Sequence, residues 1–257
     1  MQNINYTKNI EYKVAIIEIS REKQLNALNK EVIRDLEIAL GEAKKSKNIR
    51  SIILTGSGNK AFVAGADIKE FKNFHKEQAF NLSQTGKVKL FDKIANFQKP
   101  IIAAINGYAL GGGLELALSA HIRVASKNAK LGFPECSLGL IPGYGGTQRL
   151  PKIIGQGLAH EMILTGKMLS AEEAHRIGLV NHVFSEDELI EKTLDITKSF
   201  HTKSPEALSS AIKSINSCFI NSGDSVESQE FAKLFETQNF KEGVQAFMEK
   251  RKPNFNK

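Results

Sequence analysis

Residues 101–115 read Ile-Ile-Ala-Ala-Ile-Asn-Gly-Tyr-Ala-Leu-Gly-Gly-Gly-Leu-Glu, and this stretch decides the fold. Its apolar beginning follows Pro100 and ends at a polar Asn-Gly pair, which is typical of a buried strand. The residues after the three glycines are strong helix formers. A strand, a glycine turn and a helix start leave backbone N–H groups facing a space that a substrate can enter. Glu115 falls in the first helical turn, so the stretch predicts a site that stabilises negative charge and moves protons.

Strand and helix patterns alternate along the chain around this stretch. Strands are expected at residues 14–19, 49–55 and 122–125, and helices at residues 29–43 and 80–97. This alternation predicts an α/β domain with mainly parallel strands. After about residue 155 the strand signals fade, and apart from a short strand at 180–184 the rest reads as helices.

Three helix starts are indicated in this second part. The pairs Ser170/Glu173 and Ser185/Glu188 each match a capping box, in which the two side chains bond to each other's backbone amides. Ser204-Pro205 matches an N-cap followed by proline at the first helical position. Large apolar residues near the chain end are expected to pack within their own domain or in a subunit interface.

Composition limits the class of protein. The 257 residues suffice for one large domain, and no apolar run approaches the ~20 residues of a membrane-spanning helix. The first residues lack the basic and apolar regions of a signal peptide, and Cys136 and Cys218 are the two cysteines. These features predict a cytoplasmic protein without a membrane partner. The net charge of +7 comes from scattered lysines, which favours a solvated surface or a phosphate-bearing ligand over nucleic acid.

Taken in order, the motifs of the chain resemble the enoyl-CoA hydratase (crotonase) family, and most of all its bacterial enoyl-CoA hydratases and 3-hydroxybutyryl-CoA dehydratases. They cover nearly the whole chain and lie at residues 24–28, 61–70, 99–115, 134–135, 139–150, 178–180 and 247–252. The resemblance implies an α/β fold, a crotonase-like spiral of β-β-α units, over residues 1–195. It implies a helical C-terminal oligomerisation region over residues 196–257, and a homotrimer or a hexamer built as a dimer of trimers.

The resemblance also implies the reaction and its residues. The substrate would be an acyl-CoA thioester, and the hydro-lyase reaction a reversible syn addition of water to a trans-2-enoyl-CoA, without metal or separate cofactor. The backbone N–H groups of Ala66 and Gly112 would form the oxyanion hole, and Glu115 and Glu135 would be the catalytic carboxylates. Further substrate contacts are expected from Leu25, Ala27, Ala64, Asp67, Ile68, Gly111, Pro142, Gly143 and Lys252.

The chemistry of these residue types agrees with that mapping. Hydration builds negative charge on the thioester oxygen, and one preorganised backbone donor stabilises such charge by about 3 kcal/mol. One carboxyl group can take a proton from water while a second gives a proton to C2, which typically accelerates a reaction by ~10²–10⁴-fold. Residues 143–147 lack the ending of a P-loop and the full dinucleotide fingerprint, so we expect them to form a wall of the acyl pocket.

Other residues have expected roles outside the proton transfers. Asp67 is expected to shape its loop through local hydrogen bonds, and Cys136 and His121 are expected to be structural. Lys69, like Lys252, would either meet the phosphates of CoA or be solvated. The acyl chain length depends on the segment 71–90, and its shape does not follow from the sequence.

Two other functions stay open. An enoyl-CoA isomerase of the same family can work with the position of Glu135 alone, although the presence of Glu115 favours a hydratase. An RNA-binding member of the family would use a lysine-rich helix, and the basic cluster at residues 44–47 is short. A purely structural subunit is disfavoured by the intact acid pair.

Overall fold

Two β-sheets form the body of the molecule. The structure is a computed structural model that describes residues 1–255, and within them the larger sheet has six strands. Its order is β1 (Ile4–Asn9), β2 (Val14–Ile19), β3 (Ser51–Gly56), β5 (Ile101–Ile105), β7 (Ile122–Ser126) and β10 (His182–Phe184). The β1–β2 pair is antiparallel and the other pairs are parallel, so the predicted α/β class with mainly parallel strands is confirmed.

The smaller sheet explains why the chain winds as a spiral. Its order is β4 (Ala61–Val63), β6 (Tyr108–Leu110), β8 (Lys130–Gly132) and β9 (Leu169–Ser170). The chain passes from a strand of the larger sheet to a strand of the smaller sheet and then into a helix, as in β3-β4-α2, β5-β6-α4 and β7-β8-α5. The predicted repeating β-β-α unit is therefore observed.

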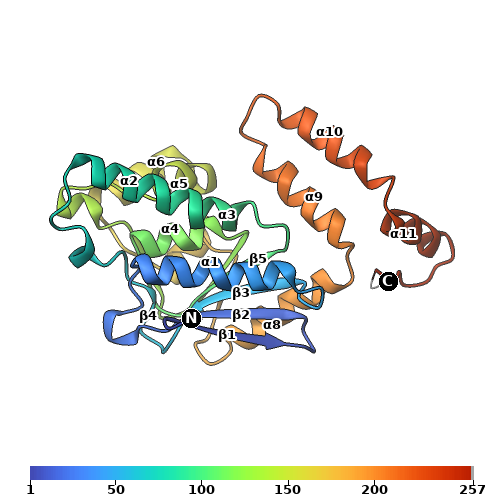
Figure 1. The fold of residues 1–257 in the computed structure, drawn as a ribbon, viewed down its shortest axis with the longest axis horizontal. Helices are drawn as coiled ribbons and strands as arrows, with labels where there is room; N and C mark the ends of the chain where they lie inside the picture. Colours follow the sequence, from blue (N-terminus) through green and yellow to red (C-terminus); the bar gives the residue numbers. More distant parts are fainter. Residues whose placement is uncertain (256–257) are drawn as a thin grey trace.

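The helices cover the sheets and continue into the C-terminal region (Figure 1). They are α1 (Lys30–Lys45), α2 (Lys76–Gly86), α3 (Asp92–Ala95), α4 (Gly112–Ser119), α5 (Gly146–Ile154), α6 (Gln156–Thr165), α7 (Ala171–Arg176), α8 (Leu189–His201), α9 (Pro205–Asn216), α10 (Gly223–Leu234) and α11 (Gln238–Met248). A π-helical segment, η3 (Lys87–Phe91), joins α2 to α3, and short 3₁₀ turns lie at η1 (Glu22–Gln24), η2 (Ile68–Glu70) and η4 (Glu135–Leu138).

The two faces of the larger sheet pack against different helices. Ala15, Ile52 and Ala103 face the main core with α1 and α4, while their neighbours Ile53 and Ile102 face α8. This alternation follows from the two-residue period of a strand, and both faces are apolar because helices cover both.

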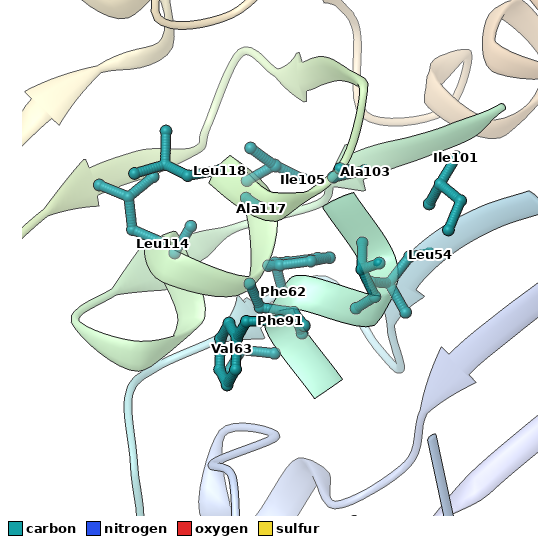
Figure 2. Close-up of a cluster of buried hydrophobic side chains, with 14 of the residues drawn as sticks. Leu54, Phe62, Val63, Phe91, Ile101, Ala103, Ile105, Leu114, Ala117 and Leu118 are labelled. Atoms are coloured by element: carbon teal, nitrogen blue, oxygen red, sulfur yellow. The ribbon is translucent and has the colours of Figure 1, made fainter. Parts of the chain in front are cut away.

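The main core gathers around α4, which is buried along its whole length. Figure 2 shows side chains from β3, β4, β5, η3 and α4 in this cluster, among them Phe62, Phe91 and Leu114. Phe62 and Phe91 are fully buried, and truncation of such a side chain to Ala costs about 3–5 kcal/mol. The core thus holds the N-terminus of α4 rigidly in place.

Two glycines let β6 and α4 pack closely against β4 and the residue before it. A Cβ atom on Gly113 would collide with the carbonyl oxygen of Val63, and a Cβ atom on Gly107 would collide with that of Lys60. A larger residue at either position would push β6 and α4 away from β4. The glycine-rich stretch that decides the fold is therefore also required by the packing of β6 and α4 against β4.

Most elements expected from the sequence are present, with some corrections. The helix expected at 80–97 is longer and contains the π-helical segment, and β1 together with the short strands of the smaller sheet was not foreseen. The Ser170/Glu173 capping box and the Ser204 N-cap are confirmed. The Ser185/Glu188 box is wrong, because those two side chains bond to each other and α8 begins after Glu188 without a side-chain cap.

The C-terminal helices α9, α10 and α11 extend away from the body as an arm (Figure 1). Buried Glu230 of α10 accepts hydrogen bonds from Ser210 and Lys213 of α9, which ties these two helices together. Exposed apolar side chains lie along the arm at Phe231, Phe235, Val244, Phe247 and Met248. The oligomerisation role of residues 196–257 and its boundary stay predictions.

Within the part of the chain that the structure describes, no helix has the length and apolar character needed to cross a membrane.

His121 is a structural residue, as its sequence context predicts. Its Nδ1 accepts a hydrogen bond from the amide of Ile101 at 2.9 Å, so its Nε2 carries the proton and donates to the carbonyl of Ala95 at 3.1 Å. Burial lowers the pKa of His121 to about 4, with a smaller contribution from Arg123. The neutral ring therefore joins β5 to the end of α3.

We predict that His121 makes the protein less stable in mild acid. The unfolded chain binds this proton near pH 6.5 and the folded chain near pH 4, so the stabilisation is present above pH 6.5 and is lost as the pH falls towards 4. The change amounts to roughly 3 kcal/mol at most. Urea unfolding at several pH values should show a flatter profile for His121→Asn, whereas an equal slope in both proteins would contradict the assignment.

Candidate active site

The start of α4 presents unpaired backbone amides. Gly111 has a φ of 50° and donates its amide to the carbonyl of Gly132 at 2.9 Å, which turns the chain from β6 into the helix. Gly112 is the first helical residue, so its N–H has no acceptor within the helix. The dipole of α4 adds positive potential at the same point.

A second amide points to the same place from the segment after β4. Leu28 and Ala66 form an isolated parallel bridge in which Leu28 donates to Gly65 at 2.9 Å and accepts from Asp67 at 2.7 Å. This pattern leaves the N–H of Ala66 outside the bridge. A Cβ atom on Gly112 would lie 3.6 Å from the Ala66 nitrogen, so the two amides border one small space.

Asp67 has a charged partner that holds this segment. Its Oδ2 lies 3.3 Å from Nη2 of Arg21, and Nη1 of Arg21 donates to the carbonyl of Ala27 at 2.6 Å. Arg21 therefore joins the segments that contain Ala27 and Ala66. The contact agrees with the expected role of Asp67 in shaping the loop.

Glu115 is a buried carboxyl group with two backbone donors. Its side chain projects from the first turn of α4, and Oε1 accepts hydrogen bonds from the amides of Tyr144 and Gly146, both at 2.7 Å. Burial raises the pKa of Glu115 to about 7; the two amides and Arg149 oppose the shift, and Glu135 adds to it. Glu115 is therefore partly protonated near neutral pH, and both backbone hydrogen bonds are accepted by Oε1, not by Oε2.

Glu135 lies on the other side of Gly111. It is the first residue of η4, and a Cβ atom on Gly111 would lie 2.6 Å from its Oε1. Within the described chain its Oε2 is buried without a hydrogen-bond partner. Burial raises the pKa of Glu135, partly offset by its own backbone amide. A buried carboxyl oxygen without a partner is suited to hold a proton or to meet a ligand.

The turn at residues 142–146 has a structural role that the sequence did not indicate. We expected a wall of the acyl pocket, but its amides also hold Glu115. A detectable signal existed in the sequence, because a Gly-rich turn before a helix often makes an anion-binding nest. Gly145 has a φ of 106°, which suits this geometry.

Tyr144 places an aromatic ring beside the two amides. The ring stacks on Phe91 with centroids 4.8 Å apart, and its Cδ2 lies 3.6 Å from the position of a Cβ on Gly112. A Cβ on Gly86 would lie 2.5 Å from its Cε1, so Gly86 makes room for the ring. Burial and the nearby Glu115 raise the pKa of Tyr144 to about 12, so its hydroxyl stays neutral at working pH.

Of the other expected site residues, Leu25 and Ala64 lie near Ala66, whereas the others are exposed or packed within their own turn. The carbonyl of Leu25 accepts from the amide of Ala64 at 3.0 Å, so this segment lies beside the chain that leads to Ala66. Ile68, Lys69 and Gly143 are exposed, and the carbonyl of Gly143 is bound by Ser83 of α2. Pro142 is buried within its turn.

Lys252 is not brought to the site by its own chain. It is exposed, and its neighbours Arg251 and Asn254 bind Glu242 of α11. Because α11 lies on the arm away from α4 (Figure 1), a contact of Lys252 with substrate would require a second subunit.

A pocket of about 250 Å³ lies beside the Leu25 segment, and it contains residues that sequence reasoning missed. Its lining residues are Glu22, Lys23, Leu25, Asn26, Ser57, Asn59, Lys60 and Ala61. Its two lysines outnumber its one acid, Glu22, and the chain leads from Ala61 on its wall through β4 to Ala66 at the site. Scattered surface lysines carry no local signal in the sequence that could have singled out these two.

No metal centre accompanies these groups in the part of the chain described: residues 1–255 contain no cluster of three or more His, Cys, Asp or Glu side chains arranged to hold an ion. Two carboxyl groups with raised pKa values beside two backbone amides are groups of the kind that can stabilise an oxyanion and transfer protons. The fold and these groups together indicate an α/β enzyme.

The chain belongs to the enoyl-CoA hydratase/isomerase family, whose sequence model matches residues 9–257. It is 42% identical over 245 residues to the short-chain-enoyl-CoA hydratase of Clostridium acetobutylicum, with 94% of each chain covered. It is 42% identical over 248 residues to the crotonyl-CoA hydratase of Syntrophomonas wolfei, with 95% of each covered. The crystal structure of an enoyl-CoA hydratase from Bacillus anthracis is similar at a TM-score of 0.91 and 38% identity, over 99% of each chain. The predicted family and fold are thereby confirmed.

We predict that one carboxyl group of the free protein titrates near pH 7 and that it belongs to Glu115. NMR of protein labelled with ¹³C at the glutamate carboxyl groups should show this resonance, and Glu115→Gln should remove it. Glu135→Gln removes a neighbouring negative charge, so it should lower the pKa of Glu115. Titration of every glutamate below about pH 5.5 would contradict the assignment.

Proposed function

We propose that the protein is an enoyl-CoA hydratase, which adds water reversibly and syn to a trans-2-enoyl-CoA. The observation that carries this proposal is the pair of carboxyl groups, Glu115 and Glu135, flanking the paired amides of Ala66 and Gly112. Both acids are present, and burial raises the pKa of each. The names of the relatives support the same reaction.

The two amides would bind the thioester oxygen. Addition of water at C3 turns the thioester into an enolate, so the charge on that oxygen grows in the transition state. Amides held in place by α4 and by the Leu28–Ala66 bridge need not reorganise as the charge develops. Each donor would stabilise the transition state by about 3 kcal/mol.

The two acids would divide the proton transfers. Glu115 would hold the water through Oε2, because Oε1 is already bound by the turn at residues 144–146. Glu135 would give a proton to C2 through its unpartnered carboxyl oxygen. Since the two groups interact, the pH dependence belongs to the pair. The addition of water changes no overall oxidation level, so the reaction needs no redox cofactor.

The pocket beside Leu25 would receive the nucleotide end of CoA. Lys23 and Lys60 can bind phosphate, and the chain from Ala61 to Ala66 connects the pocket with the thioester. This arrangement places the charged end of the substrate at the surface and its acyl end at the buried acids. The positive net charge of the chain would also attract the phosphate-bearing substrate.

A short acyl chain suits the site best. The Tyr144 ring fills the space between Gly112, Gly86 and Phe91, and a bulky ring beside Gly112 would limit the room for a long acyl chain. The relatives named short-chain-enoyl-CoA and crotonyl-CoA hydratase support the same class. We therefore propose that crotonyl-CoA is a better substrate than a long-chain 2-enoyl-CoA.

Isomerase activity is the second candidate, because the matching family contains both activities. It would need Glu135 but not Glu115, and the two backbone hydrogen bonds that hold Glu115 favour hydration.

The basic cluster that suggested RNA binding lies at the end of α1, where lysines also complement the helix dipole. The free cysteines Cys136 and Cys218 support the proposed cytoplasmic location.

The direct test is the loss of crotonyl-CoA absorbance on hydration. Glu115→Gln and Glu135→Gln should each lower kcat by about 10²–10⁴-fold, because each removes a group that transfers a proton. Glu161→Gln, on the exposed surface of α6, is the matched control and should behave as the wild type. A Glu115→Gln enzyme with wild-type hydration would overturn the role of Glu115, and an inactive wild type would overturn the proposed reaction.

Replacement of Lys23 and Lys60 should separate substrate binding from chemistry. Lys23→Met and Lys60→Met should each raise KM for crotonyl-CoA by roughly 10-fold and leave kcat near the wild-type value, because each loses one charged contact far from C2 and C3. Lys47→Met removes the same charge beyond α1 and serves as the control. Unchanged KM values in both variants would show that the nucleotide binds elsewhere.

A further inference from the structure

The turn that holds Glu115 is itself held by one side chain, Arg149. Nη1 of Arg149 donates to the carbonyl oxygen of Tyr144 at 2.9 Å, and Nη2 donates to Oδ1 of Asp92 at 2.6 Å. The side chain of Arg149 is 17% exposed, so its guanidinium is largely shielded from water, whereas the side chain of Asp92 is 38% exposed and partly solvated. Tyr144 is thus bound on both sides: its carbonyl by Arg149 and its amide by Glu115.

We propose that Arg149 is a positioning residue for catalysis, which fixes the turn at residues 144–146 so that its two amides hold Glu115 in its working orientation. The proposal rests on the proposed function in assigning Glu115 to the reacting water. Arg149 would act through the backbone of Tyr144 and would not touch the substrate.

The backbone of the turn is shaped to admit the guanidinium group. A Cβ atom on Gly145 would collide with Nη1 of Arg149, and the φ of Gly145 is 106°, in the left-handed region. The backbone conformation therefore favours glycine at this position, and a side chain there would displace the guanidinium from the turn. Because Arg149 is in the first turn of α5 and Asp92 begins α3, the guanidinium also joins two helices to the turn.

An arginine fits this position better than a lysine would. Its planar fork sends separate donors to Tyr144 and to Asp92, whereas a lysine presents one compact ammonium group. The positive charge also reaches Glu115, and it lowers the pKa of that carboxyl. Both effects would favour the ionised Glu115 that a water-activating role requires.

Other charged groups near Glu115 define what the test must separate. Glu135 of η4 raises the pKa of Glu115, and the neutral hydroxyl of Tyr144 belongs to the turn itself. Asp92 pairs with Arg149, and Glu70 of η2 acts on Tyr144. Arg149 is the positive group that acts on Glu115 among these neighbours. Removal of Arg149 should therefore raise the pKa of Glu115 and shift the pH profile of the reaction to higher pH.

The test compares Arg149→Met, Arg149→Lys and Asp92→Asn in the crotonyl-CoA assay across pH. Arg149→Met should lower kcat by roughly 100-fold through misplacement of Glu115, with little change in KM. The acidic limb of the profile of kcat against pH should move to higher pH in this variant, because Glu115 without the positive charge holds its proton more tightly. Arg149→Lys should restore the position of the limb and only part of kcat, and Asp92→Asn should lower kcat mildly.

Lys152→Met is the matched control, since it removes one positive charge from the exposed face of the same helix. It should retain the wild-type kcat and pH profile. Wild-type kcat and an unmoved limb in Arg149→Met would overturn the proposal. If Arg149→Met fails to fold by circular dichroism, Arg149→Lys decides: a reduced kcat at unchanged KM supports the proposal, and a wild-type kcat overturns it.

A failure of the proposed function would be recognised separately. A wild-type protein that does not hydrate crotonyl-CoA overturns the function, while ¹³C NMR of the glutamates still tests Arg149. The resonance of Glu115 should then titrate at a higher pH in Arg149→Met than in Lys152→Met. Equal titration in the two variants would overturn the role of Arg149 whatever the reaction.

Discussion

Two hydrogen bonds from the amides of Tyr144 and Gly146 to Glu115 are the interaction on which the rest of the site depends. A carboxyl group buried this deeply is costly unless donors satisfy it. The two amides satisfy one oxygen, and the second is left for a ligand. The burial keeps the pKa near neutrality instead of near that of a solvated glutamate, so the group can exchange protons at working pH.

The second constraint is the close packing of β6 and α4 against β4. Gly107 and Gly113 leave no room for a side chain against β4 and the residue before it, so β6 and α4 settle directly on that part of the chain. This packing brings the amide of Gly112 next to that of Ala66. The paired donors are thus a result of how the core closes, and the buried side chains around α4 hold them in place (Figure 2).

The two acids differ because their surroundings differ. Glu115 has two amide donors and lies in a fully buried helix, whereas Glu135 starts a short turn and has a buried oxygen without a partner. Burial raises the pKa of both groups, and Glu135 also raises the pKa of Glu115. Two carboxyl groups that influence each other across Gly111 suit a reaction in which one proton leaves and another arrives.

The sequence by itself determined the alternation of strands and helices, the glycine turn before α4 and the two acids, because these depend on local periodicity and on residue types within a few positions. It also carried the motifs that place the chain in its family. The short strands of the smaller sheet were missed because two or three residues are too few to show a period. Only the tertiary structure decided that the turn at residues 142–146 holds Glu115, that Arg149 joins this turn to Asp92, and that Lys23 and Lys60 share a pocket, since these contacts join residues far apart in the chain.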